Sequence, residues 1–431
     1  MHISRKSLGG FGRIALFAAP AIAIMITAFE SKTKAVAPAA APVSPSVYLT
    51  TLGIKFEGAA GCSAAKCHGA EKSVDKKNFW GNEATLWGSR KDPHHGAYRT
   101  LVKPLAKAIA AKLKIASALK SERCLNCHST LAVSPTGADL AGSDYKAAEG
   151  VSCNSCHGPS QKYREPHSTQ NWIDTQRAKM DHAQLLTTFG LYDTLPVFER
   201  ASRCASCHLA IEPDLVAAGH PQPTFEMNHF SEIYPDRHWH DPAGTFPAEL
   251  WASGQLAELH DALHQMAVYA ASKAPDAAAE YTKAEYQALA HYSVLNVLIS
   301  SGPIASPDAA ALDASIRQLL TAKDMGTANT EALAAAEKCN ARGLVAAIGA
   351  FKPDKAVAAK VLAAIAASDV GVKYGPRGQE QQAYAIEALA AAAGNDAVTK
   401  AVAPMLPAKP GDVIAPAVFA KGLADVKAKA K

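Results

Sequence analysis

The chain has 431 residues, of which 48% are hydrophobic, 19% charged and 7% aromatic. This composition excludes an intrinsically disordered chain, and the length is enough for two or three domains. The 44 basic and 39 acidic residues give a net charge of +5 without a long basic run, so nucleic acid is not an expected partner. The nine cysteines and sixteen histidines are the informative residues, because their positions are clustered.

Residues 1–37 predict a signal peptide or an N-terminal anchor. Arg5, Lys6 and Arg13 precede an apolar stretch at 14–29, and small residues suited to cleavage follow it. This stretch is longer than a usual signal core and shorter than a comfortable membrane span, so cleavage is favoured and a retained inner-membrane anchor is the alternative. Cleavage would remove five basic residues and one acidic residue and leave a nearly neutral, periplasmic chain.

The rest of the chain divides by composition into a tether and two domains, and the predicted fold class is mainly α. Residues 38–46 are rich in Ala and Pro, which suits a flexible tether. Residues 47–245 hold eight cysteines and twelve histidines among many turn-forming residues, so we expect little regular structure there beyond a helix within 101–119. Residues 246–431 are Ala-rich with helical periodicity and predict a helical C-terminal domain. Its helices are predicted at 247–273, 278–299, 307–323, 328–350, 354–368, 378–393 and 395–405.

Three segments share the pattern Cys-x-x-Cys-His, which is typical of covalent attachment of c-type haem. In that chemistry the two thiols bond to the two vinyl groups of the porphyrin, and the histidine binds the iron as its proximal ligand. Three matches are too many to arise by chance from this composition. The motifs are Cys124-Leu-Asn-Cys127-His128, Cys153-Asn-Ser-Cys156-His157 and Cys204-Ala-Ser-Cys207-His208.

A fourth segment, Cys62-Ser-Ala-Ala-Lys-Cys67-His68, has two more residues between its thiols, and the longer turn can still reach both vinyl groups. It precedes the other three in the chain, and we therefore expect four covalently bound haem c groups. Two alternatives are a four-thiolate zinc site built by the next two motifs and a small disulfide loop between Cys62 and Cys67. The histidine that ends every motif favours haem over both. Cys339 stands alone in an Ala-rich segment and is expected to be a buried packing thiol.

Histidines supply the expected sixth ligands of the irons. Eight more histidines lie in the haem region, whereas Met180 and Met227 are its only methionines, so low-potential bis-histidine haems are expected. Four macrocycles within roughly 190 residues would lie about a nanometre apart, which is close enough to pass electrons. Their propionates would make the nearly neutral chain acidic, which favours a redox partner with a basic surface.

Three longer segments beside these motifs are typical of one family. They read Asp92-Pro-His94-His-Gly-Ala-Tyr-Arg-Thr-Leu101, Glu149-Gly-Val-Ser-Cys153-Asn-Ser-Cys156-His-Gly-Pro159 and Ala218-Gly-His220-Pro-Gln-Pro-Thr-Phe-Glu226. Over about residues 55–241 the chain thus resembles the tetrahaem cytochrome c-554 family, the electron acceptors that serve hydroxylamine oxidation in ammonia-oxidising bacteria. The resemblance implies distal iron ligands at His94, His167 and His220, with His95 as the alternative to His94.

The resemblance also implies three bis-histidine haems and one five-coordinate haem, with the iron of His128 as the open one. His182, His229 and His238 are spare ligands that would close it, and the segment around His238 resembles a Pro-x-His-Trp segment of some relatives. The chain after 246 is longer than this family needs, and a packing or assembly domain is expected there. Within it, His260 and His264 lie one helical turn apart and are expected to be surface residues rather than a metal site.

The sequence therefore predicts an exported tetrahaem electron carrier between periplasmic redox partners, soluble or anchored at the inner membrane. The alternative is a multihaem reductase whose five-coordinate haem acts on nitric oxide, nitrite or hydroxylamine. An open axial position separates the carrier from the enzyme, and the sequence leaves that question and the oligomeric state open. A third alternative, with the thiols in zinc sites or disulfides, predicts a colourless helical scaffold protein.

Overall fold

The fold is mainly helical, as the sequence predicts. Isolated β-bridges join Phe56 to Ala141 and Val133 to Asp139, and the described part of the chain contains no strand. No helix in this part is both long and apolar enough to cross a membrane. The computed structural model describes residues 45–73, 81–89, 92–234, 246–274, 276–408 and 412–430.

The expected signal or anchor at 1–37 and nearly all of the expected tether at 38–46 lie outside the described residues, and so does His238. Residues 41–431 form one compact unit. The division of this unit into two domains at 245/246 stays a prediction.

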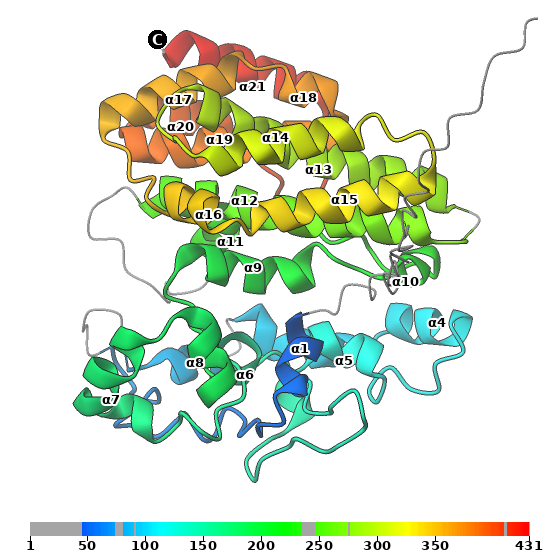
Figure 1. Cartoon of the computed structure of the whole chain (residues 1–431), viewed down its shortest axis with the longest axis vertical. Coiled ribbons are helices and arrows are strands. Elements are labelled where there is room, and N and C mark those ends of the chain that lie inside the picture. Colours follow the sequence, from blue (N-terminus) through cyan, green and yellow to red (C-terminus); the bar gives the residue numbers. More distant parts are fainter. Residues whose placement is uncertain are drawn as a thin grey trace, which may run out of the picture. The chain divides into compact units, whose positions relative to one another are not determined.

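Up to residue 234 the chain forms short helices joined by turns and long connections (Figure 1). Pro104 opens the helix expected within 101–119, which is limited to α4, and Gly190 ends α8 in a left-handed conformation. The elements are α1 (Pro45–Thr51), α2 (Glu83–Gly88), η1 (Pro93–Gly96), α3 (Ala97–Thr100), α4 (Pro104–Lys112), α5 (Glu122–His128), η2 (Ala147–Glu149), α6 (Cys153–His157), η3 (Pro166–Ser168), α7 (Gln170–Thr175), η4 (Arg177–Lys179), α8 (His182–Phe189), α9 (Val197–His208), α10 (Pro213–Ala217) and α11 (Met227–Ile233).

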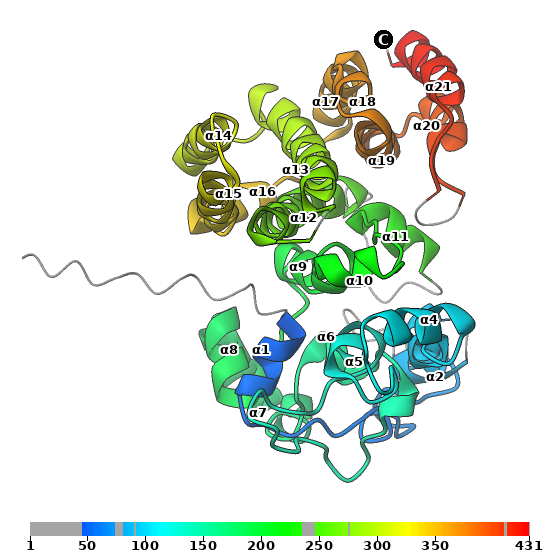
Figure 2. The same ribbon diagram turned by 90° about the vertical axis from the view of Figure 1, so that its right-hand side faces the viewer.

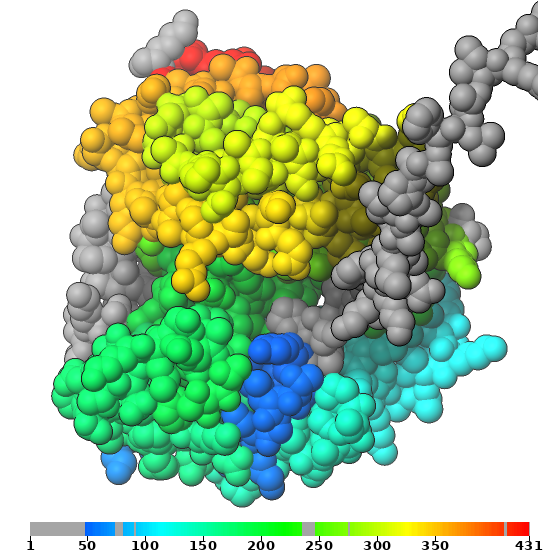
Figure 3. Space-filling view, viewed as in Figure 1, coloured from blue at the N-terminus to red at the C-terminus, as the bar shows by residue number. Residues whose placement is uncertain are grey.

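Small apolar clusters hold these short helices together. In one cluster Leu49 of α1 packs with Phe56, Leu140 and Leu186. Figure 3 shows α1, in blue, at the surface between a green and a cyan segment. Two further clusters centre on Leu101 and on three residues from α4 and α10. None of the three is large, so apolar packing alone gives this region little cohesion.

After residue 245 the helices are longer and pack as neighbouring pairs (Figure 2). The predicted helix at 328–350 is two helices, because Asn340 caps the first and Ala341 adopts an extended conformation. The last helix was not predicted, although Pro416 opens it and Phe419, Leu423 and Val426 recur at helical spacing. The elements are α12 (Phe246–Ala271), α13 (Ala277–Ser300), α14 (Pro307–Leu319), α15 (Met325–Cys339), α16 (Arg342–Gly349), α17 (Lys355–Ala367), α18 (Val370–Lys373), α19 (Gly375–Ala393), α20 (Asp396–Val402), η5 (Ala403–Met405) and α21 (Pro416–Lys429).

Helix α12 lies at the centre of the largest apolar core. It packs against α9 and α11 on the side of the Cys/His motifs and against α13, α15 and α19 among the later helices. Trp251 and Leu263 of α12 are fully buried in this core, together with Ala201 and Ala205 of α9. Figure 1 shows α9 between the short helices and α12. The helix that contains the fourth motif is therefore anchored in the core of the later helices.

Candidate haem sites

Three motifs lie at the C-terminal ends of the helices α5, α6 and α9, each of which ends at the motif histidine. In a helical turn the residues i, i+3 and i+4 lie on one face. The two cysteines and the histidine of each motif have this spacing, so all three side chains project from the same face of their helix. This arrangement allows both thiols and the histidine to meet one porphyrin.

The first motif forms a turn instead of a helix, because its cysteines are five residues apart. The backbone N–H of His68 donates to the carbonyl of Cys62 at 3.2 Å, and that of Cys67 donates to Ala64 at 2.8 Å. These bonds close the longer loop and bring the histidine back beside the first thiol. Cys62 and Cys67 are both free thiols, so the alternative disulfide loop is absent from the structure.

Three proximal histidines each face one of the expected distal histidines. The ring centres of His68 and His167 are 6.3 Å apart, with an angle of 6° between the ring planes. The ring centres of His128 and His220 are 6.2 Å apart, and their ring planes are inclined at 68°. The third pair is His208 and His94, whose ring centres are 6.1 Å apart and whose ring planes are inclined at 84°.

The common spacing of these pairs fits an iron between the two rings. A ligating imidazole nitrogen lies about 2.0 Å from its metal and about 1.1 Å from its own ring centre. Two imidazoles on opposite sides of one iron therefore have ring centres about 6 Å apart. Rings in direct face contact would be separated by about 3.5 to 4 Å. The residues present thus fit a haem iron at three places.

The Nδ1 atoms of five of these six histidines lie within hydrogen-bond distance of another polar atom, which leaves Nε2 of each to face the partner ring. Nδ1 of His167 lies 3.0 Å from the carbonyl of Tyr163 and 2.6 Å from that of the next residue. Nδ1 of His220 lies 2.8 Å from the carbonyl of Pro221. Nδ1 of His128 lies 3.2 Å from a carbonyl of α3 and 2.8 Å from a threonine hydroxyl. A metal-ligating histidine is usually fixed by such a second hydrogen bond.

Two of the pairs contain a carboxylate instead of a neutral acceptor. Nδ1 of His68 lies 3.0 Å from Oε2 of Glu83, and this hydrogen bond raises the pKa of His68. Nδ1 of His94 lies 3.0 Å from Oδ1 of Asp92, which also accepts a hydrogen bond from the hydroxyl of Tyr234. Burial opposes ionisation of Asp92 and would raise its pKa. The hydrogen bond to His94, the charge of His94 and the hydrogen bond from Tyr234 outweigh burial and hold the pKa of Asp92 below its usual value.

Burial acts on two other motif histidines, His208 and His128. Burial lowers the pKa of His208 to about 4, and the rings of Phe225 and Phe230 lie 5.2 and 5.7 Å from its ring. Burial also lowers the pKa of His128. A neutral imidazole is the form that binds iron, so burial favours the required state at both positions.

Thiols of different motifs lie next to each other. Cys62 of the first motif is hydrogen-bonded to Cys153 of the third, and this bond lowers the pKa of Cys62 to about 7. Cys127 of the second motif is hydrogen-bonded to Cys207 of the fourth. The third and fourth motifs approach each other at Cys204, whose pKa is raised to about 12 by burial and by the nearby third-motif thiol. The motifs thus follow the spatial order first, third, fourth and second.

The third motif is fixed to the fourth by Arg203, a buried residue of α9 that sequence reasoning missed. Its Nε donates to the carbonyl of Ser155 at 2.5 Å, and its guanidinium lies 6.0 Å from the ring centre of Tyr192. The N–H of Tyr192 in turn donates to the carbonyl of His157 at 2.9 Å, and the hydroxyl of Tyr163 donates to the same carbonyl at 3.2 Å. These bonds fix the backbone that presents the proximal histidine.

Several histidines that the sequence left open have other contacts. The ring of His95 meets Trp87 edge-on at 4.5 Å, so the structure favours His94 over His95 as the distal residue. Nε2 of His182 lies 3.6 Å from Glu199, and Nδ1 of His229 lies 2.9 Å from a glutamate of α19. At the second motif, where the resemblance implies an open iron, the ring of His220 faces that of His128.

Two expectations for the helical region have different outcomes. Cys339 is fully buried, and its thiol lies 3.7 Å from the carbonyl of Ala335, as expected of a packing residue. His260 and His264 were expected on an exposed face, but both are half-buried because α12 is the central helix. Their rings are 4.6 Å apart, and burial lowers the pKa of His264 to about 4. Within the described ranges, no three or more His, Cys, Asp or Glu side chains are grouped to hold a metal ion by themselves.

Comparison with known families agrees with this geometry. Residues 62–158, which include the first three motifs, match the family described as cytochrome c554 and c-prime. The matched segment covers less than half of the chain. The match supports a c-type cytochrome assignment, and this family implies covalently bound haem c and a role in electron transfer. No curated protein and no solved structure matches the chain.

The match to the cytochrome c554 family ends at the third motif, whereas the sequence resemblance extended to about residue 241. The fourth motif and His220 therefore rest on their spacing and on the ring geometry. Sequence reasoning missed Glu83, which is fifteen residues from its histidine, and it quoted Asp92 without a role. The Asp-Pro-His spacing was an available signal, because an Asp side chain commonly accepts a hydrogen bond from the residue two positions later.

Proposed function

We propose that this cytochrome is an exported tetrahaem electron relay, which passes electrons between periplasmic redox partner proteins through four haems attached at the four Cys/His motifs. The main support is the set of three histidine pairs with ring centres 6.1 to 6.3 Å apart. Export is inferred from the N-terminal segment of the sequence alone.

In this proposal each paired histidine has one role. His68, His128 and His208 are the proximal ligands of the first, second and fourth haems, and His157 is that of the third. The distal ligands are His167 for the first haem, His220 for the second and His94 for the fourth. Bound haem supplies a reversible one-electron site at each motif.

The contacts between thiols support an order of electron transfer. Because each thiol bonds to a porphyrin edge, motifs whose thiols touch hold haems whose edges are close together. The Cys62–Cys153 and Cys127–Cys207 contacts join the first haem to the third and the second to the fourth. Electrons would therefore pass in the order first, third, fourth and second, or the reverse, and would enter or leave at the two ends.

The charge of the protein supports a basic redox partner. Each haem would add two propionates to a chain whose mature form is nearly neutral, and the holoprotein would be acidic. An acidic surface attracts a basic partner over long range and raises the rate of encounter at low ionic strength.

The alternative function, a reductase of small nitrogen species, needs an open iron. Sequence reasoning placed that iron at the second motif, where the structure has His220 at 6.2 Å from His128. At the second motif the described geometry therefore favours the relay over the reductase.

The test is the visible spectrum of the reduced holoprotein with and without carbon monoxide, in the wild type and in His94→Ala, His167→Ala and His220→Ala. Each variant should keep four haems and gain one iron that binds carbon monoxide, about a quarter of the Soret absorbance. His260→Ala, at a histidine of α12 outside the haem region, is the control and should leave the spectrum of the wild type unchanged. A variant that gains no such site would contradict the distal assignment, and a colourless holoprotein would exclude haem.

A further inference from the structure

A group of buried acids lies where α11, α12 and α19 meet. Glu226 and Glu258 are fully buried, and Glu380 is 4% exposed. Three carboxylates within one protein core cannot all be charged without large cost, because burial and mutual repulsion both favour the protonated form. At least one of them is therefore ready to change its protonation state in response to a nearby charge.

The acid group is connected to the fourth haem site through α11. The rings of Phe225 and Phe230 contact the ring of His208, and Glu226 directly follows the first of them. The Glu226 carboxylate caps α11 by accepting hydrogen bonds from the N–H groups of Asn228 at 3.0 Å and His229 at 2.6 Å. Its position is thus fixed beside the aromatic layer that covers the proximal ligand, where water is excluded and charges interact strongly.

Ionisable groups from each packed helix face this carboxylate. On α11 the charge of His229 favours ionisation of Glu226, and on α19 that of Glu387 opposes it. On α12 the buried Glu258 accepts a hydrogen bond from the N–H of Met227 at 2.9 Å. The further groups around Glu258 and Glu380 are Asp261, Arg377, Tyr384 and His291.

Burial and the surrounding groups act in opposite directions on the pKa of Glu226. Burial raises its pKa to about 7, against the lowering by its two backbone hydrogen bonds and by His229. Burial raises the pKa of Glu258 further, and the charge of Glu226 adds to that shift. Glu226 is therefore the member of the group that an added charge would titrate near neutral pH.

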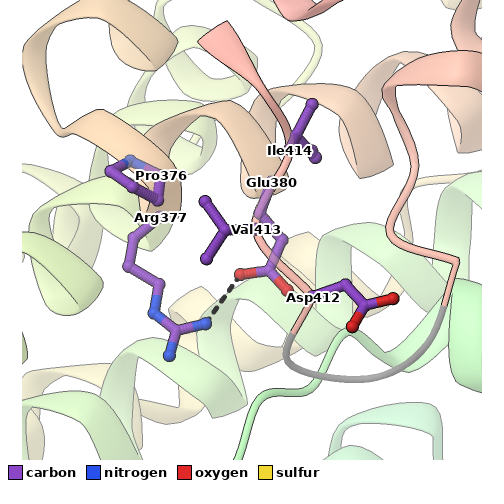
Figure 4. Close-up of a pocket in the computed structure, with 6 residues that line it drawn as sticks. All are labelled: Pro376, Arg377, Glu380, Asp412, Val413 and Ile414. Atoms are coloured by element: carbon purple, nitrogen blue, oxygen red, sulfur yellow. Dashed lines mark hydrogen bonds and ion pairs between the residues drawn. The ribbon is translucent and has the colours of Figure 1, made fainter.

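Two polar contacts join the buried acids to partly exposed groups. The side chains of His229 and Glu387 are 13% and 22% exposed, and Nδ1 of His229 lies 2.9 Å from Oε2 of Glu387. The backbone N–H of His229 donates a hydrogen bond to Glu226. On the other side Arg377 donates to Glu380 at 2.9 Å. Figure 4 shows this pair in the lining of a small surface pocket beside Asp412.

We propose that Glu226 is a redox-linked proton-binding site of the fourth haem. When one electron from the donor reaches the His208 site, one proton from water binds the Glu226 carboxylate, and reoxidation releases both. The negative charge of the added electron is thereby balanced by the positive charge of the bound proton. This gives the C-terminal helices, which surround Glu226, a role in electron transfer. This inference depends on the proposed function, because it requires a haem at His208.

The test uses the full-length holoprotein in an electrochemical cell, with infrared difference spectra and midpoint potentials recorded between pH 5 and pH 9. Reduction near neutral pH should produce the C=O band of one protonated carboxylic acid. One haem potential should fall with rising pH around neutrality, by at most about 59 mV for each tenfold fall in proton concentration. Glu226→Gln should lose both signals. The glutamine carbonyl can still cap α11, which keeps the fold.

Glu232→Gln removes an exposed carboxylate from the same helix and should keep the band and the pH dependence. Should Glu226→Gln fail to fold, Glu258→Gln removes a neighbouring negative charge and should move the pH-dependent range to lower pH. Unchanged signals in Glu226→Gln, or an unmoved range in Glu258→Gln, would overturn the inference. A holoprotein without haem on the fourth motif, detected by peptide mass, would refute the proposed function as well, whereas a haem present without proton uptake refutes only this inference.

Discussion

The two parts of the compact unit differ in what fills their interiors. The later helices share one large apolar core around α12, whereas residues up to 196 have only small separate clusters. In the second part, Ala-rich helices bury their own side chains against each other, and no cofactor is needed for that packing. In the first part the space between histidines is where a haem fits, so the cofactor replaces the missing core.

The strongest test of this comparison is the chain without haem. We expect backbone amides in residues 45–196 to exchange rapidly with solvent in protein expressed without haem-attachment machinery, while α12, α13 and α19 stay protected. Hydrogen exchange measured by mass spectrometry on both forms gives the result for each segment. Equal protection of the two parts in the haem-free chain would contradict the idea that haem supplies the core of the first part.

The second test disrupts the apolar core. Leu263 is fully buried in α12, and Leu263→Ala should lower the free energy of unfolding by about 2 to 5 kcal/mol. Urea unfolding followed by far-UV circular dichroism measures the change. Val372→Ala, at a residue that is 81% exposed, should change the same free energy by less than about 0.5 kcal/mol. Both variants should keep the haem spectrum of the wild type. Loss of that spectrum in Leu263→Ala would show that the haem-containing part depends on the apolar core around α12.

The third test uses the pH dependence of stability. Glu226, with a pKa of about 7, binds its proton more tightly in the folded chain than in the unfolded chain, where a glutamate ionises near about 4.3. Its contribution to stability is therefore complete below about pH 4 and is lost as the pH rises to about 7. Glu226→Gln should remove this decline, by up to about 1.4 kcal/mol per pH unit in urea unfolding. A decline of the same size in the variant would assign it to other groups.

The fourth test compares the haem sites with each other. The carboxylate of Asp92 makes His94 a stronger electron donor, so Asp92→Asn should raise one haem potential, by about 60 mV for a tenfold change in the redox equilibrium. Tyr234→Phe removes a hydrogen bond from Asp92 and should lower the same potential by a smaller amount. Thr100→Val, beside His128, removes only a neutral partner and should have the smallest effect. Spectroelectrochemical titration gives all three shifts, and equal signs for Asp92→Asn and Tyr234→Phe would contradict this account.

The sequence predicted the long helices because apolar periodicity and capping residues are local signals. It missed the break at Asn340, since a single Asn between Ala-rich turns is a weak signal against strong helix formers. Within the candidate site, the motif spacing alone predicted the haem-attaching thiols and the proximal histidines. The distal positions came from a family resemblance, and the structure brings all three of them opposite a proximal histidine.

The pairing of those residues was beyond reach of the sequence. His208 and His94 are 114 positions apart in the chain, and nothing in the local pattern of either one selects the other. The family resemblance implied an open iron at the second motif, whereas the structure has His220 facing His128. The acid group at Glu226 was missed as well, because its members come from three helices and each looks like a solvated charge in its own segment.

The central claim, that three histidine pairs enclose three haem irons, is tested most directly by electron paramagnetic resonance of the fully oxidised holoprotein. The angle between two axial imidazole planes sets the splitting of the iron orbitals. The 6° pair His68–His167 should give a rhombic low-spin signal, and the 84° and 68° pairs should give two strongly anisotropic low-spin signals. Three rhombic signals, or high-spin iron at any of these sites, would contradict the account.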